Sequence, residues 1–175
     1  MAGKAKPKAK PMTHTDEAGR ARMVDVGPKV ATRRLASARG TVRFNAAAFH
    51  ALLENRLAKG DALAVARLAG IQAAKRTAEW IPLCHQVPLD NLEVDISLSE
   101  ADRSAEVSVT AAARWTTGVE MEALVAVSAA CLALYDMAKA LDRGITIDGI
   151  ELLEKRGGRS GSWKRRRSRK RTDRV

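Results

Sequence analysis

Three segments of the chain have apolar residues at helical spacing, and each begins and ends at a residue that suits a helix boundary. Residues 62–80 and 118–143 are apolar around most of a helical circumference, and residues 46–58 form a shorter third segment. Asn45 and Asp61 precede the first turns of 46–58 and 62–80, where their side chains predict N-caps. Residues that stop helices follow the three segments, namely Gly60, Pro82 and Gly144.

Strict alternation of apolar and polar residues marks candidate strands between these helices. Residues 92–98 and 107–111 alternate with a period of two, which predicts a β-hairpin with its turn at residues 100–104. Short strands are also expected at 41–44 and 145–153, and the apolar residues 23–26 suit an ordered loop or a strand edge. The pattern predicts an α+β domain with helices packed on an antiparallel sheet.

Composition refines this prediction in two respects. At 175 residues the chain suits one core, and with 46% hydrophobic but only 3% aromatic residues that core should be aliphatic and closely packed. The helix at 62–80 is expected to be central and buried. Two helices this apolar exceed what one small domain can cover, so we expect a partner subunit to bury part of their surface.

The net charge of +11 comes from the two ends of the chain. Without the basic runs at 1–12 and 164–175, nineteen basic and nineteen acidic residues remain. We therefore expect two disordered basic tails flanking a neutral domain at 13–163. Nucleic-acid binding is the alternative function that the tails suggest, and the neutral domain restricts it to non-specific contacts with phosphates.

Several classes of protein are not expected. Cys84 and Cys131 do not suggest a disulfide scaffold, and His14 and His50 lack the spacing of metal ligands, so neither a metal site nor another cofactor is predicted. We expect no stretch to be long and uncharged enough to span a bilayer, and no apolar signal region is apparent at the N-terminus. The cytoplasm is the expected location.

Charged residues inside the apolar helix at 118–143 are candidates for chemistry, because burying a charge needs a compensating partner. Asp136 and Lys139 share a helical face, where an ordinary surface ion pair is the alternative. Glu120 and Glu122 suit the positive end of the helix dipole. Fourteen residues separate Glu122 from Asp136, roughly 21 Å along the axis, so one substrate can meet both only across a subunit boundary.

Other candidates lie in loops and near helix ends. His85 follows Leu83 and Cys84 in the loop after the second helix, where an ordinary surface histidine is the alternative. Cations suited to phosphate occur at Lys59, at Lys75 with Arg76, and at Arg159 in the glycine-rich segment 155–161. That segment is not a Walker motif, and a mobile hinge to the tail is its alternative reading.

Six motifs occur in a specific order: MVDV, KGDALAVARLAGIQAAKRT, IPLCH, TGVEMEAL, YDMAKA and RGGRSG. Together they resemble the molybdenum-cofactor biosynthesis protein C family, whose members are cyclic pyranopterin monophosphate synthases. The resemblance extends over residues 13–163. It implies a ferredoxin-like α+β fold, a hexamer built as a trimer of dimers, and an active site at a dimer interface.

The resemblance also implies a lyase reaction in molybdenum cofactor biosynthesis. The small-molecule substrate would be a 3′,8-cyclised dihydro-GTP made by a radical enzyme, and the products cyclic pyranopterin monophosphate and pyrophosphate. Such a rearrangement needs proton transfers and neutralisation of the leaving pyrophosphate. The implied catalytic residues are Asp136, Lys139 and Lys59. The implied substrate-binding residues are Leu83, Cys84, His85, Glu120, Met121, Glu122, Lys75 and Arg159.

The sequence departs from the family pattern at three positions. Thr116 replaces a common lysine before TGVEMEAL, Arg159 replaces the lysine of the glycine-rich loop, and Gln86 replaces a proline that often follows LCH. These changes remove one cation, alter the geometry of another and leave the His85 loop less rigid. A family member that keeps the oligomer but lacks catalysis is therefore a third functional alternative.

Overall fold

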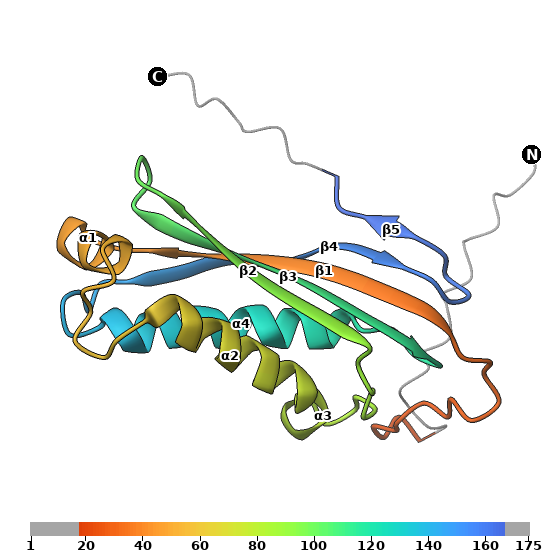
Figure 1. The fold of residues 1–175 in the computed structure, drawn as a ribbon. Helices are drawn as coiled ribbons and strands as arrows, with labels where there is room; N and C mark the ends of the chain where they lie inside the picture. Colours follow the sequence, from red (N-terminus) through yellow and green to blue (C-terminus); the bar gives the residue numbers. More distant parts are fainter. Residues whose placement is uncertain (1–17, 167–175) are drawn as a thin grey trace, which may run out of the picture.

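The computed structural model describes residues 18–166, which form a sheet with two long helices packed on one face (Figure 1). The elements in chain order are β1 (Thr32–Arg43), α1 (Ala46–Leu53), α2 (Ala62–Lys75), α3 (Thr77–Trp80), β2 (Asn91–Ser99), β3 (Ser104–Trp115), α4 (Glu120–Ala138), β4 (Thr146–Arg156) and β5 (Trp163–Lys164). The strand order is β2-β3-β1-β4-β5 and every neighbouring pair is antiparallel. This confirms the predicted α+β architecture.

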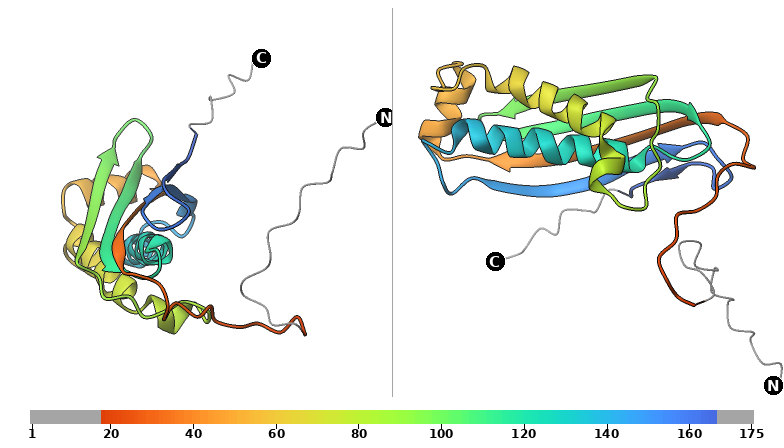
Figure 2. Two further views of the ribbon diagram at one scale, coloured as in Figure 1. Left: turned by 90° about the vertical axis from the view of Figure 1, so that its right-hand side faces the viewer. Right: turned by 90° about the horizontal axis from the view of Figure 1, so that it is seen from below.

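Small residues on the inner face of the sheet let the helices approach closely. Ala36, Ala38 and Val42 of β1 are at most 1% exposed, and Val107 and Val109 of β3 are equally buried. α2 and α4 lie side by side across this face, as the view from below shows (Figure 2). Alternate residues point to the other face, which carries ion pairs and which no helix among residues 18–166 covers.

Several local predictions are confirmed. Asn45 caps α1 by accepting a hydrogen bond from the Ala48 N–H at 2.8 Å, and Asp61 caps α2 through the Ala64 N–H at 3.0 Å. β2 and β3 form the predicted hairpin, with Ser99 paired to Ser104.

Other boundaries differ from the prediction. The expected strand at 41–44 is the last part of the twelve-residue β1, and the expected helix at 46–58 ends at Leu53. The helix predicted at 62–80 breaks at Arg76 into α2 and α3, where the buried Thr77 hydroxyl donates to the Ala74 carbonyl at 2.9 Å. A hydroxyl bonded to the preceding turn bends helices, and here it accompanies the break.

The α2 helix is also less buried than expected. Val65 is 41% exposed and Leu68 59% exposed, so the prediction of a central helix covered on several sides is wrong for a single chain. α4 ends at Ala138 rather than at residue 143. Gly144 does not provide the expected left-handed stop: its φ is not positive, and its N–H is bound by the Asp142 carboxylate at 2.8 Å.

The apolar character of α4 contradicts the expectation that no segment could span a bilayer. By length and composition alone, α4 is apolar enough to cross a bilayer, contrary to the expectation from sequence. In this fold 61% of the most apolar 18-residue stretch of α4 is buried inside the protein. Packing against α2, β1 and β3 therefore accounts for its apolar character.

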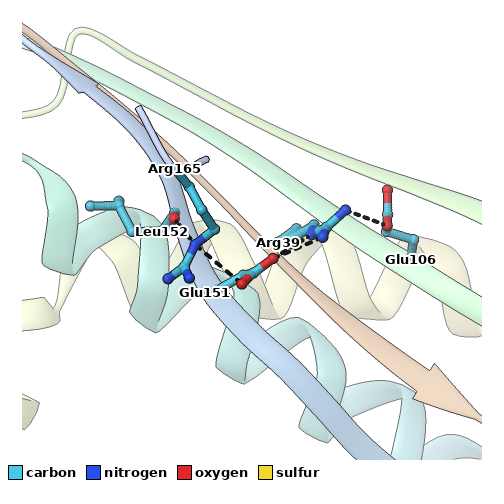
Figure 3. Close-up of polar contacts among 5 residues, drawn as sticks. All are labelled: Arg39, Glu106, Glu151, Leu152 and Arg165. Atoms are coloured by element: carbon cyan, nitrogen blue, oxygen red, sulfur yellow. Dashed lines mark hydrogen bonds and ion pairs between the residues drawn. The ribbon is translucent and has the colours of Figure 1, made fainter. Parts of the chain in front are cut away.

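An ion-pair network on the open face of the sheet holds the C-terminal strand (Figure 3). Arg165 donates to the Leu152 carbonyl at 2.8 Å and pairs with Glu151 at 3.1 Å. Arg39 connects Glu151, at 2.8 Å, with Glu106, at 3.5 Å. Described structure thus continues past the predicted domain boundary at residue 163. The arm 1–12 and residues 167–175 lie outside the described residues, so their disorder stays a prediction.

Replacing Gly40 by alanine should destabilise the fold. A Cβ built on Gly40 would lie 2.8 Å from Val127 Cγ1 and 3.2 Å from both Cys131 Sγ and Ile150 Cγ1. Because such overpacking forces side chains from α4 and β4 apart, we expect Gly40→Ala to lower the free energy of unfolding by about 1–3 kcal/mol. Urea denaturation followed by circular dichroism measures the change.

The matched control is Ser37→Ala, a change of one small residue on the opposite face of the same strand. It should alter stability by less than about 0.5 kcal/mol. Equal midpoints for both variants would show that Gly40 is not required for the close approach of α4.

Candidate active site

A pocket of about 460 Å³ lies at the N-terminal end of α4, between the start of that helix and the loop after α3. Six of the predicted substrate-binding residues line it: Leu83, Cys84, His85, Glu120, Met121 and Glu122. Val24, Val26 and Lys29 close another side, so the MVDV segment forms a pocket wall without being a strand. The structure therefore brings together residues from three separate motifs.

Glu122 is the buried acid of this pocket, with only 3% of its surface exposed. Burial raises its pKa from 4.5 to about 7, and the neighbouring Glu120 carboxylate adds to this effect. Glu122 can therefore gain or lose a proton near neutral pH, as a group that transfers protons must. Burial, with a smaller contribution from the Glu122 charge, also raises the pKa of Cys84, so its thiol stays protonated.

His85 is bound to the MVDV segment. Its Nε2 lies 2.8 Å from the Val24 carbonyl oxygen. Since a carbonyl only accepts, Nε2 carries the proton and the ring is oriented with Nδ1 left for another partner. The next residue, Gln86, donates from Nε2 to the Lys75 carbonyl at 3.1 Å, which ties the His85 loop to the end of α2.

Lys155 joins the glycine-rich loop to the start of α4. Its Nζ lies 3.3 Å from Glu120 Oε1 and 2.7 Å from Ser160 Oγ. Gly157 and Gly158 have φ values of 96° and 74°, and a side chain at either would collide with β1 at Arg33 and Arg34. The loop is thus a turn seated on the start of β1, in place of the mobile hinge considered from sequence.

A second cavity, of about 650 Å³, borders this loop and shares Lys29 with the first pocket. Arg159 and Arg34 line it, so the cavity carries three cations. Arg34 also donates to the Trp115 and Thr116 carbonyls at 3.2 and 3.1 Å. Its guanidinium therefore lies beside the position where the family commonly has a lysine.

The three predicted catalytic residues meet at the opposite end of α4. Asp136 accepts from Lys59 at 2.6 Å and pairs with Lys139 at 2.7 Å, and all three side chains are about half exposed. Hydrogen bonds from Lys139 and Lys59 lower the pKa of Asp136 to about 2, so it is ionised at neutral pH. The same contact raises the pKa of Lys139.

Two predicted residues lie apart from these groups. Lys75 is exposed at the end of α2 and does not line the pocket, and Arg159 lines only the second cavity. Sequence reasoning did not single out Lys29, Arg34 or Lys155. Lys155 could have been predicted from the sequence, because it begins the glycine-rich segment. Arg34 could not, because it lies in a stretch for which no helix or strand was predicted. Within residues 18–166, no group of three His, Cys, Asp or Glu side chains could hold a metal ion.

Removing the buried charge of Glu122 should change how stability depends on pH. The folded-state pKa lies above the unfolded value, so the wild-type protein loses stability as pH rises from about 4.5 through 7. Glu122→Gln cannot ionise, and its stability relative to wild type should therefore increase over this interval. Urea unfolding at several pH values measures the difference.

Glu93→Gln is the matched control, since Glu93 is an exposed glutamate on β2. The difference in free energy of unfolding between Glu93→Gln and wild type should stay constant across this pH interval. If the difference between Glu122→Gln and wild type were also constant across this interval, the carboxyl of Glu122 would have an ordinary pKa in the folded protein.

Comparison with known proteins places this arrangement in a family. The MoaC family model matches residues 23–158. A cyclic pyranopterin monophosphate synthase of Thermomicrobium roseum is 56% identical, covering 88% of this chain and 93% of its own length. Proteins of the same name from Parvibaculum lavamentivorans and Chloroflexus aggregans are 54% and 53% identical, covering 89% and 90% of this chain and 98% and 95% of theirs. With the motifs, the fold and these matches in agreement, the chain belongs to the MoaC family.

Proposed function

We propose that this chain is a lyase that converts 3′,8-cyclised dihydro-GTP to cyclic pyranopterin monophosphate and pyrophosphate, a step of molybdenum cofactor biosynthesis. Relatives more than 50% identical over most of the chain bear the name of the synthase. The observation that carries the proposal is the single pocket in which Leu83, Cys84, His85, Glu120, Met121 and Glu122 come together. A small-molecule substrate suits a pocket of this size.

The pocket suits the purine-derived ring of the substrate. Leu83 and Met121 offer apolar surface, and the oriented His85 ring and the Glu122 carboxyl offer polar contacts. Opening and reclosing the ring requires proton transfers, for which a group with a pKa of about 7 is suited. We assign Glu122 the part of a proton donor or acceptor to the ring, in addition to binding it.

The neighbouring cavity suits the triphosphate. Lys29, Arg34 and Arg159 present three cations, and the glycine-rich loop that carries Arg159 is tied to Glu120 by Lys155. Attack of a ribose hydroxyl on the α-phosphate expels pyrophosphate, whose developing charge these cations stabilise. The Arg34 guanidinium at the Thr116 carbonyl compensates for the absent lysine, which favours an active enzyme over an inactive scaffold.

If the Lys59–Asp136–Lys139 cluster acts on the same substrate as the pocket, it needs a second chain. Fourteen residues of helix separate Asp136 from Glu122, roughly 21 Å, so the cluster cannot reach the pocket of its own chain. We propose that it completes the pocket of a neighbouring subunit, in a homo-hexamer arranged as a trimer of dimers. The exposed Val65 and Leu68 on α2 and Leu132 on α4 are apolar surface that such a partner would bury.

We propose that residues 13–163 constitute the synthase domain and that the basic ends, 1–12 and 164–175, are accessory to it. A substrate and products that are all small, charged and water-soluble suit an enzyme of the cytoplasm.

Loss of the Asp136 carboxylate should abolish most turnover. Asp136→Asn keeps the shape of the side chain but removes the charge that both lysines bind, so we expect the rate to fall at least about a hundredfold. Incubation with the cyclised GTP derivative, followed by mass spectrometry of the cyclic phosphate product, measures it. Asp95→Asn, at an exposed position on β2, is the control and should retain the wild-type rate.

A wild-type protein that is folded yet forms no product would refute the proposed function. A near-normal rate for Asp136→Asn would remove Asp136 from the mechanism while leaving the reaction assigned.

Mixing two inactive variants tests whether sites are shared between chains. Asp136→Asn damages the cluster and His85→Ala damages the pocket. If each site takes its pocket from one chain and its cluster from the other, a co-refolded one-to-one mixture should recover about a quarter of the wild-type activity. The comparison is with each variant refolded alone. No recovery in mixed oligomers verified by mass spectrometry would show that each chain works by itself.

A further inference from the structure

A polar junction ties the start of α1 to the segment that follows α4. The Asp142 carboxylate is central to it: Oδ2 accepts from the Asn45 backbone N–H at 2.6 Å, and Oδ1 accepts from the Gly144 N–H at 2.8 Å. Asn45 adds a second connection, because its side-chain Nδ2 donates to the Leu141 carbonyl at 3.1 Å. The two segments are ninety-seven residues apart in sequence and are held together at this point.

This junction lies at the end of α4 that carries the Asp136 cluster (Figure 1). Asp142 follows Lys139 by three residues, and its N–H bonds to the Ala138 carbonyl at 3.2 Å. On the other side of the junction, α1 leads into the loop that contains Lys59. The buried Leu57 and the Gly60 turn complete that loop.

The two lysines reach Asp136 by different routes. Lys139 belongs to the end of the same helix, three residues on, so local geometry alone delivers it. Lys59 comes from a separate loop, yet its Nζ binds both Asp136 Oδ2 at 2.6 Å and the Asp136 carbonyl at 2.9 Å. Something must fix the position of α1 relative to α4 for this double contact to form.

We propose that Asp142 is a positioning residue which, through Asn45 and α1, holds Lys59 against Asp136. The alternative is that Asp142 only closes the turn at Gly144. The two alternatives differ in one respect. If Asp142 positions Lys59, its loss should release the Lys59 ammonium from Asp136 and leave the contact between Lys139 and Asp136 almost unchanged. The consequence for turnover rests on the proposed function, whereas the consequence for Lys59 does not.

The test is competitive acetylation of the intact protein, with the rate at each lysine read by mass spectrometry. In Asp142→Ala, Lys59 should be labelled about fivefold faster than in wild type, because its ammonium is released from Asp136. Lys139 should change by less than about twofold, since its partner is on its own helix. Asp148→Ala, which removes an exposed carboxylate paired with Arg43 on β1, is the control and should match wild type.

Asn45→Ser provides a second variant that is milder to folding. Serine caps a helix about as well as asparagine, so α1 is retained while the bond to Leu141 is lost. Lys59 labelling should again increase selectively. A wild-type labelling rate at Lys59 in both folded variants would overturn the proposal, and so would an equal increase at Lys59, Lys139 and Lys155, which indicates general loosening.

Steady-state kinetics adds the functional consequence. We expect Asp142→Ala to lower kcat about tenfold and to leave KM within about twofold, because the pocket at the other end of α4 is untouched. An unchanged kcat, or a change confined to KM, would contradict a positioning role. If the wild-type protein itself does not turn over, the proposed function fails, and the selective labelling of Lys59 alone decides the role of Asp142.

Discussion

The rigid length of α4 is the constraint on which the rest of the molecule depends. A helix rises about 1.5 Å per residue and cannot fold back, so Glu122 and Asp136 stay roughly 21 Å apart. Close packing holds the helix in place: Gly40 of β1 meets Val127 and Cys131, and Gly70 of α2 faces the Ala126 carbonyl. The fold therefore holds the pocket and the Lys59–Asp136–Lys139 cluster at a fixed separation within one chain.

The environments at the two ends of α4 give their carboxylates opposite properties. Glu122 is buried and keeps its proton up to about neutral pH, whereas Asp136 is exposed, bound by two lysines and ionised over the same range. Pairs of acids whose pKa values are driven apart are typical of sites where one group exchanges protons and the other stabilises charge. Asp142 and Lys155 belong to the polar contacts that stabilise the arrangement at each end.

Sequence alone predicted the features that depend on local chemistry. Caps at Asn45 and Asp61 and the β2–β3 hairpin follow from side-chain type and spacing over a few positions. The residues that line the pocket were expected only from the resemblance of the motifs to a known family. β1 was largely missed because residues 32–40 include three Arg and two Ala, which do not favour strands, and only pairing with β3 and β4 makes them a strand. Arg34 was missed for the same reason, since its partners at Trp115 and Thr116 are some eighty residues away.

The protonated state of Cys84 has a consequence for the durability of the pocket. Thiols react with peroxide and with electrophiles through the thiolate, and a raised pKa keeps that form scarce. The pocket thus places a sulfur atom beside the buried Glu122 carboxyl in a form that oxidises less readily than a thiolate. Its nearness to Glu122 reinforces this, because an anion at Glu122 opposes a second anion on the sulfur.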